Sequence, residues 1–167
     1  MINVIPPGLI FIAGAFIVPL IRGKAKSIYL LLLPVLSFIN LIYISKGTHG
    51  VINFLDYQII FCNIDRLSLV FGYIFHIIAF LTILYGINMK NDNEYTAGLF
   101  YAGCAIGVIF SKDLISLFCF WEMMTIGSVL LIWARKTKKS IEAGFRYVLV
   151  HFFGGVILLV GIILYIY

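Results

Sequence analysis

The 167 residues are 63% apolar by the AVILMFWYC count and only 11% charged, whereas soluble domains are about 45–50% apolar and about 25% charged. This composition excludes a water-soluble globule and predicts one compact unit whose apolar surface faces lipid. The net charge of +5 does not indicate a nucleic-acid partner, because long uncharged runs and 16% aromatic residues are not typical of nucleic-acid-binding proteins.

Uncharged apolar runs predict six membrane-spanning helices. In chain order the predicted spans are residues 4–21, 28–45, 67–87, 95–111, 114–134 and 148–167. Most contain roughly 17 to 21 residues, near the ~20 that a helix needs to cross the hydrocarbon layer. Helices are expected because lipid offers no partner for unpaired backbone groups. The prediction is therefore an all-α integral membrane fold in a single unit, residues 1–167.

Basic residues are divided unequally between the two sets of connections, nine against three. By the positive-inside rule, the first, third and fifth connections are cytoplasmic and both termini lie outside. The nine are Arg22, Lys24, Lys26, Lys90, Arg135, Lys136, Lys138, Lys139 and Arg146, and the three are Lys46, Arg66 and Lys112. We expect the basic cluster at 135–139 to anchor this topology rather than to bind acidic lipid or protein.

Two connections on the other side differ in character. Residues 47–65 mix apolar and polar side chains irregularly, and we expect either a strand pair or a short helix lying on the bilayer. Lys112 and Asp113 leave almost no loop between the fourth and fifth spans. These spans should therefore form an antiparallel hairpin, with Ser111 or Asp113 as N-cap of the fifth helix.

Glu122 stands out because it lies near the middle of the fifth span. A central acidic residue costs roughly 2.5–3.5 kcal/mol, and the ten Leu, Ile, Phe and Val residues of that span contribute roughly 3–6 kcal/mol toward insertion. Insertion alone does not explain Glu122. One interpretation is a proton path, and the other is a structural hydrogen bond or a salt bridge to a partner subunit. Cys119 and Thr125 share nearly the same face, and Trp121 is expected to shield the carboxyl.

Two histidines fall inside predicted spans, and each could relay a proton near neutral pH. His151 is the better candidate, because Tyr147 precedes it by four residues and Gly154 and Gly155 leave room beside it. For His76, a hydrogen bond to a neighbouring helix is the expected role. The candidate proton-path residues are therefore Glu122 and His151.

Other kinds of site are not expected. Cys62, Cys104 and Cys119 form no CxxC pair, so neither a zinc site nor a disulfide framework is indicated. The three histidines have no metal-ligand spacing, and no acid, histidine and nucleophile triad can be assembled. We expect no metal, no cofactor and no enzyme activity from the chain alone.

Small residues indicate close helix packing. Gly103 and Gly107 form a GxxxG pattern in the fourth span, and Gly154 and Gly161 lie seven apart in the sixth. Both patterns predict close contact between helix backbones. Trp133, next to the basic cluster, is expected to anchor its helix at the membrane interface.

Three segments together resemble a known family. These are residues 64–69 (IDRLSL), 113–124 (DLISLFCFWEMM) and 143–155 (AGFRYVLVHFFGG). In order and spacing they are similar to the antiporter-like subunits of respiratory complex I, group 4 hydrogenases and Mrp-type cation/proton antiporters. The Mrp D subunit type is the most similar. The phenylalanine, tryptophan and glutamate at 120–122 are the most specific part of the resemblance.

The resemblance implies a role for Glu122 and an incomplete machine. In that family the fifth-helix glutamate pairs with a lysine on a broken seventh helix, and the six spans here correspond to about the first third of a member. We expect other membrane subunits to supply the missing helices and the lysine. The implied function is part of a proton-translocating or monovalent cation/proton antiporter subunit, multi-pass in the cell inner membrane. The other partners are the lipid bilayer, protons and sodium. The alternatives are a scaffolding membrane subunit or a non-functional remnant of a split gene.

Overall fold

The computed structural model describes residues 5–54, 57–89 and 91–166. Val4, Lys90 and Tyr167, which belong to predicted spans or to the basic set, lie outside the described residues. The elements in chain order are α1 (Pro7–Ile17), the 3-10 turn η1 (Val18–Leu20), α2 (Lys24–Tyr43), β1 (Gly47–Phe54), β2 (Tyr57–Ile64), α3 (Arg66–Tyr85), α4 (Asp92–Phe110), α5 (Leu114–Trp133) and α6 (Lys138–Ile166).

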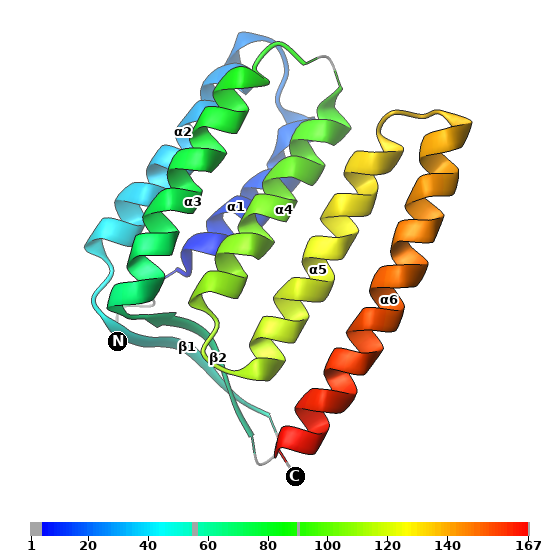
Figure 1. Ribbon diagram of the computed structural model, residues 1–167. Coiled ribbons are helices and arrows are strands. Elements are labelled where there is room, and N and C mark those ends of the chain that lie inside the picture. The colour runs from blue at the N-terminus through cyan, green and yellow to red at the C-terminus, as the bar shows by residue number, and fades with distance from the viewer. Residues whose placement is uncertain (1–4, 55–56, 90, 167) are drawn as a thin grey trace.

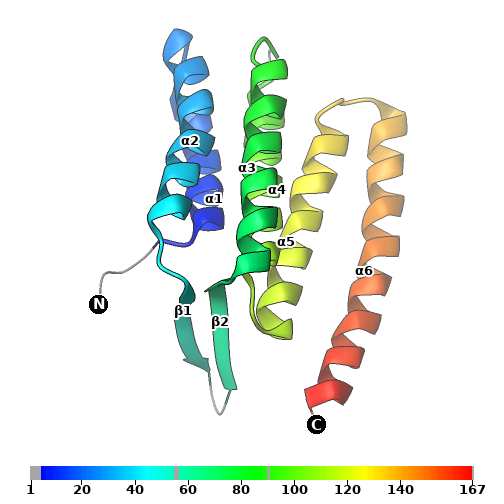
Figure 2. The same ribbon diagram turned by 60° about the vertical axis from the view of Figure 1, so that its left-hand side comes forward.

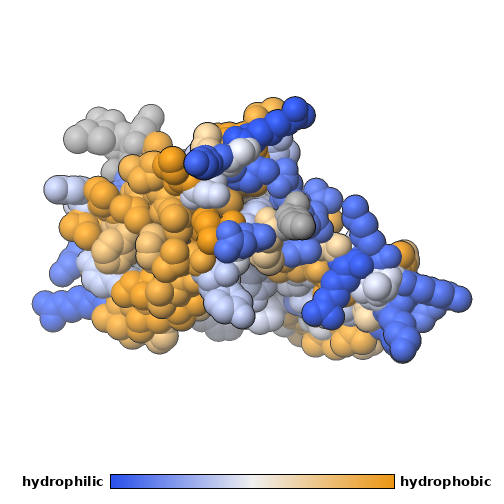
Figure 3. Space-filling model, turned by 90° about the horizontal axis from the view of Figure 1, so that it is seen from above, coloured by the Kyte–Doolittle hydropathy of each residue, from blue (hydrophilic) through white to orange (hydrophobic). Residues whose placement is uncertain are grey.

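The helices run alternately up and down (Figures 1 and 2). The α1–α2, α3–α4 and α5–α6 connections meet at one end, which we call the basic end. The β1–β2 hairpin and the α4–α5 turn lie at the other, the hairpin end, where α1 begins and α6 finishes. Seen onto the basic end, hydrophilic side chains lie across the surface and hydrophobic ones flank them (Figure 3). The grouping of connections that the basic residues predict is therefore the one observed.

Four helices of the described chain are long and apolar enough to cross a membrane, namely α2, α3, α5 and α6. The apolar stretch formed by α1 and η1, Pro7–Leu20, is shorter. Large apolar side chains point outward from all of these helices, and Phe152 of α6 is 66% exposed. The structure is that of a mostly helical, multi-pass membrane protein.

Helix boundaries differ from the predicted spans where polar residues continue a helix beyond the apolar run. α6 begins at Lys138, ten residues before the predicted start at 148. Thr137 and Ser140 cap it reciprocally, each side-chain oxygen accepting from the other residue's backbone N–H at 3.1 Å. Likewise α4 begins at Asp92, because the Asn91 side chain accepts from the backbone N–H of Asn93. The apolar count identified the apolar part of these two helices and missed their capped polar turns.

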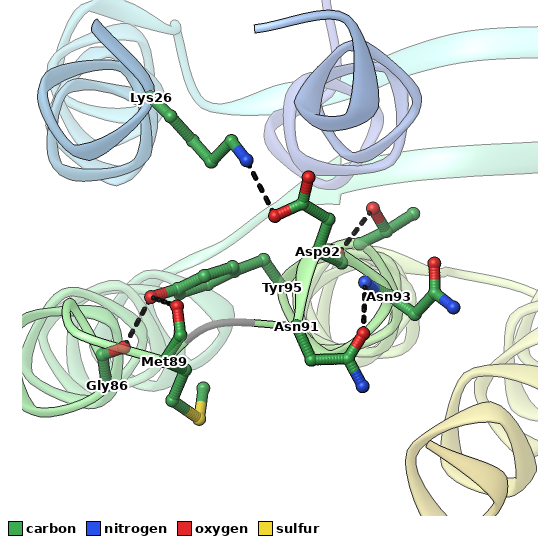
Figure 4. Close-up of polar contacts among 8 residues, drawn as sticks. Lys26, Gly86, Met89, Asn91, Asp92, Asn93 and Tyr95 are labelled. Carbon is green, nitrogen blue, oxygen red and sulfur yellow. Dashed lines mark hydrogen bonds and ion pairs between the residues drawn. The ribbon is translucent and has the colours of Figure 1, made fainter. Parts of the chain in front are cut away.

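The basic end is held together by polar contacts between helices (Figure 4). The Lys26 ammonium at the start of α2 lies 2.6 Å from the Asp92 carboxylate at the start of α4. Beside it, the Tyr95 hydroxyl donates to the carbonyls of Gly86 and Met89 at 2.6 and 3.2 Å. The start of α2 is thereby joined to the start of α4, and α4 to the α3–α4 connection.

The α4 helix lies at the centre of the bundle, packed by α1 on one side and α5 on the other. At the α1 contact, a side chain on Gly8 would collide with the backbone of Gly103 and Gly107. The predicted close approach at the α4 GxxxG pattern is confirmed. For α6 the close contact stays a prediction, because among the described residues no other atom lies within 4 Å of the side-chain position of Gly154 or Gly161.

Residues 47–64 form an antiparallel strand pair, so the strand alternative is confirmed over the short helix. Gly47 pairs with Ile64 and Phe54 pairs with Tyr57. Asp113 is the N-cap of α5 and also fastens this hairpin. One carboxylate oxygen accepts from the Ser116 backbone N–H at 2.8 Å, and the other accepts from the Ile60 backbone N–H at 2.7 Å. Asp113 therefore sets both the start of α5 and the position of β2.

Asp65 joins the hairpin to α3 as a second cap. Its carboxylate accepts from the Ser68 backbone N–H at 2.7 Å, and the Ser68 hydroxyl accepts from the Asp65 backbone N–H at 2.9 Å. The backbone hydrogen bond from Ser68 holds the pKa of the Asp65 carboxyl below its usual value, because it stabilises the ionised form. The cap is thus charged at neutral pH, next to the positive end of the helix dipole.

Candidate functional site

Glu122 and His151 are brought together by two antiparallel neighbouring helices. Glu122 lies near the middle of α5 and His151 near the middle of α6, and these helices run side by side in both ribbon views (Figures 1 and 2). The Glu122 Oε1 atom is 4.0 Å from the His151 Nε2 atom. The two residues selected from the sequence therefore lie within one small site.

Both facing atoms are buried without a hydrogen-bond partner among the described residues. The side chains themselves are only partly covered, with 32% of Glu122 and 17% of His151 exposed. A separation of 4.0 Å is too long for a hydrogen bond. An unpaired carboxyl oxygen and an unpaired ring nitrogen in apolar surroundings are costly, so a proton, a small movement or a third group is needed to satisfy them.

The carboxyl of Glu122 occupies space left by a missing side chain on α6. A Cβ atom added at Gly155 would collide with Glu122 Oε1. Gly155 follows His151 by four residues and so lies one turn along the same helix face. Gly155 thus admits the carboxyl to the α6 backbone, directly beside the histidine.

Two aromatic rings hold the imidazole in place. The His151 ring stacks on Trp121 of α5, with ring centres 6.1 Å apart and planes 24° apart. Tyr147, one turn earlier on α6, lies on it at 5.7 Å and 31°. Trp121 contacts the histidine partner of Glu122, so its expected shielding of the carboxyl itself stays a prediction.

α5 and α6 also meet toward the basic end. Trp133 fits against Gly144, where any side chain would collide with the indole, and the Trp133 Nε1–H donates to the Ile141 carbonyl at 3.4 Å. The Trp133 ring also packs against Phe145 with centres 5.4 Å apart. Trp133 therefore joins the two helices that carry the site, a role that its interfacial position did not predict.

Other polar residues singled out from the sequence do not join the site. The Thr125 hydroxyl donates to the Trp121 carbonyl of its own helix at 3.2 Å, and Cys119 is exposed. The third candidate, His76, hydrogen-bonds to Ser37 of α2, as expected of a lone membrane histidine. Only Glu122 and His151 face one another.

Sequence reasoning placed Gly155 beside His151 but missed its contact with Glu122, and it missed Gly144 altogether. Their signal is position: Gly155 is four residues after His151, and Gly144 is eleven before Gly155, which places both close to one helix face. The sequence pattern drew attention to Gly154 and Gly161 instead, because seven-residue spacing is the usual sign of a packing face. That spacing cannot show which face of α6 meets α5.

The arrangement is suited to proton exchange. A proton shared by one carboxyl and one imidazole gives either a neutral pair or an ion pair, and both have zero net charge. Moving the proton between them therefore avoids burying an isolated charge. A displacement of about 1 Å brings the two atoms from 4.0 Å to hydrogen-bond distance. Within the described residues, no cluster of three His, Cys, Asp or Glu side chains has the arrangement of a metal site.

Comparisons with known proteins connect the chain to a family of membrane proteins. Residues 111–167, which contain Glu122 and His151, match the family described as NADH:quinone oxidoreductase/Mrp antiporter, TM. Over 169 residues the chain is 35% identical to the Na(+)/H(+) antiporter subunit A1 of Staphylococcus haemolyticus, covering 90% of this chain and 21% of that protein. It is 33% identical over 175 residues to subunit A1 of Staphylococcus aureus, covering 93% and 21%.

A solved structure shows the same fold. The chain superposes with a TM-score of 0.73 on a chain of the membrane-bound sulfane sulfur reductase, an archaeal respiratory membrane complex, at 22% identity and with 93% of this chain and 35% of that chain covered. The protein spans about a fifth of the length of its antiporter relatives. Those relatives are A1 subunits, whereas the motifs favoured the D type of the same family. The predicted resemblance to the NADH:quinone oxidoreductase/Mrp antiporter family is therefore confirmed.

Proposed function

We propose that this chain forms part of a proton-translocating or monovalent cation/proton antiporter subunit, in which Glu122 and His151 exchange the transported proton. The observation that carries the proposal is the pair of unpartnered buried atoms, Oε1 and Nε2, 4.0 Å apart. The printed names of the relatives, Na(+)/H(+) antiporter subunit A1, support sodium and protons as the exchanged ions.

The pair needs a third group to move a proton onward. Exchange between Glu122 and His151 alone returns the proton to where it began, so a further donor or acceptor has to approach from outside α5 and α6. The family resemblance implies a lysine on another helix, supplied by other membrane subunits. α6 leaves room for such helices, since only 11% of its most apolar stretch is buried.

A purely structural role for Glu122 is less well supported. If the residue only joined helices, its carboxyl oxygens would be expected to accept hydrogen bonds from a neighbouring helix. Instead, Oε1 has no partner among the described residues and faces a titratable ring. The scaffolding alternative is therefore not favoured.

We further propose six spans in the cell inner membrane, with the basic end in the cytoplasm and both termini outside. The support is the excess of basic residues at one end of the bundle and the positive-inside rule. Single cysteines at Lys46 and Lys138, placed in a cysteine-free chain, should react with a membrane-impermeant maleimide from opposite sides, Lys46 from outside. Labelling of both from the same side would contradict the orientation.

His151→Gln tests the proton-exchange role directly. Glutamine keeps hydrogen-bonding capacity but cannot titrate, and a positioned proton-transfer group contributes roughly 10²- to 10⁴-fold. In vesicles containing the complete transport protein, we expect ion-driven proton movement to fall by about 10²-fold with expression unchanged. His49→Gln, which alters the histidine of β1 that contacts the Ser45 carbonyl, is the matched control and should retain transport. Full activity of His151→Gln would remove the histidine from the proposed path.

A further inference from the structure

A second buried polar cluster lies among α1, α2 and α3. His76 of α3 is 2% exposed and Ser37 of α2 is fully buried. The His76 Nδ1 atom is 2.6 Å from the Gly72 carbonyl oxygen, and its Nε2 atom is 2.9 Å from the Ser37 hydroxyl. The same hydroxyl is 3.1 Å from the Pro7 carbonyl oxygen at the start of α1. Three consecutive short contacts thus connect three helices.

When His76 is neutral, the cluster has two hydrogens for its three polar contacts. The Gly72 carbonyl can only accept, so Nδ1 of His76 carries a hydrogen. In the neutral ring Nε2 then has none, and the single Ser37 hydrogen has to serve both remaining contacts. If it points to Nε2, the Pro7 carbonyl keeps only the hydrogen bond that it accepts within α1. If it points to Pro7, Nε2 and the hydroxyl oxygen face each other as two acceptors.

We propose that His76 and Ser37 form a second proton-binding site. One proton taken from water becomes the Nε2–H of His76 and is donated to the Ser37 oxygen, and the hydroxyl hydrogen then turns to the Pro7 carbonyl. No other bond is made or broken. All three contacts then have a hydrogen, and the tie between α1 and α2 strengthens when the proton binds.

The ring is confined mainly by aromatic side chains. Phe11 of α1 meets it edge-on with ring centres 5.5 Å apart, and Phe38 of α2 lies at 5.9 Å. Tyr73, from the same helix as His76, packs on Phe38 at 5.4 Å. An open groove of about 160 Å³ beside the ring is lined, apart from His76 itself, by apolar side chains. The packing therefore fixes the ring in the position that the three contacts require.

Titratable groups on the surrounding elements are occupied elsewhere or uncharged. α1 has no titratable side chain between Pro7 and Ile17. On α2, Tyr29 donates to a backbone carbonyl and Lys26 pairs with Asp92, and on α4, Tyr95 donates to backbone carbonyls. Of the β2 side chains in the adjacent core, the titratable one is Cys62, whose thiol is uncharged when protonated. In these contacts of the described residues, the proton on His76 is held by hydrogen bonds rather than by a counter-charge.

Another polar side chain of α2 lies toward the hairpin end. Asn40 lies three residues after Ser37, and its amide nitrogen donates to the Ile5 carbonyl at 2.9 Å. Ile5 is 58% exposed. Ser37 and Asn40 thus contact the carbonyls of the residues on either side of Pro6, the second of them at the surface. Water at the hairpin end is the expected source of the proton.

The new site is separate from the Glu122 and His151 pair. α4 stands between the two, since it packs against α1 and α3 on one side and against α5 on the other. No shared residue connects them among the contacts described above. In this proposal His76 gains its proton independently of Glu122 and His151. Proton binding then strengthens the hydrogen bond between α1 and α2.

Ring-¹⁵N histidine spectra of the protein in lipid bilayers test the proposal, with His76→Gln identifying the signal. At pH 8 we expect neutral His76 with hydrogen on Nδ1, and at pH 5 hydrogen on both ring nitrogens. Ser37→Ala should reduce the doubly protonated fraction at pH 5 by about threefold or more, as expected for loss of one hydrogen bond to a charged donor.

Ser27→Ala is the matched control, because Ser27 is a half-buried serine of the same helix and takes no part in the cluster. It should leave the His76 spectrum unchanged. A His76 that stays neutral at pH 5, that carries its hydrogen on Nε2 at pH 8, or that responds equally to both serine variants would overturn the site. These spectra do not depend on transport, so they stand apart from the test of Glu122 and His151.

Discussion

Glu122→Gln is expected to abolish ion-coupled proton movement, by 10²-fold or more, in the complete transport protein. Glutamine fills nearly the same volume against Gly155 and can still hydrogen-bond to His151, so helix packing is retained. It cannot release a proton. Any proton that reaches His151 then has no acceptor on α5, and the exchange across the 4.0 Å separation stops.

The measurement is the dissipation of an imposed proton gradient on addition of sodium to membrane vesicles, alongside the amount of folded protein. Glu142→Gln is the matched control, because Glu142 is an exposed glutamate near the start of α6. It removes the same charge from the same helix pair and should leave transport intact. Equal losses in both variants would assign the effect to charge at the membrane surface instead of to the site. Full activity of Glu122→Gln would reduce Glu122 to a structural residue.

The sequence could predict the site because both residues are exceptions to their surroundings. A carboxylate in the middle of an apolar helix has few roles in lipid, and this singled out Glu122 without a structure. His151 was selected through its neighbours Tyr147 and Gly155, and both contact the site. The sequence could not predict that Glu122 and His151 face each other, because their distance depends on how α5 packs against α6, for example where Trp133 contacts Gly144.

The hydropathy pattern could not predict the capped helix ends or the cluster around His76, for two different reasons. The early start of α6 rests on the reciprocal hydrogen bonds of Thr137 and Ser140, a local polar signal that an apolar count ignores. The His76 cluster depends on Ser37, a small residue thirty-nine positions away. Serine is common in membrane helices, so nothing in its local sequence distinguishes it from Ser27 until the helices are packed.

Gly155→Ala should reduce transport while leaving the helix bundle folded, whereas Gly154→Ala, its neighbour, should leave both transport and the fold intact. The added methyl at 155 collides with the end of the Glu122 side chain, which is flexible, rather than with backbone. The carboxyl is therefore expected to swing away from His151 instead of forcing α5 and α6 apart. The unpaired Oε1 then loses its position opposite Nε2, and proton exchange is expected to fall by about 10²-fold.

Stability separates this explanation from general damage. Alanine is favoured over glycine inside a helix by about 1 kcal/mol. At Gly154, where no other atom lies near the new methyl, that gain should appear in full as a higher unfolding temperature. At Gly155 the gain is offset by displacement of the carboxyl, so the unfolding temperature should change little.

A third variant distinguishes displacement of the carboxyl from any other effect of the methyl. This variant combines Gly155→Ala with Glu122→Asp. Aspartate is one methylene shorter than glutamate, so its carboxyl no longer reaches the added methyl. The double variant should therefore unfold at a higher temperature than Glu122→Asp alone. A Gly155→Ala protein with normal transport would show that the carboxyl does not need its place against the α6 backbone. A strongly destabilised one would mean instead that Gly155 serves chiefly to pack α5 against α6.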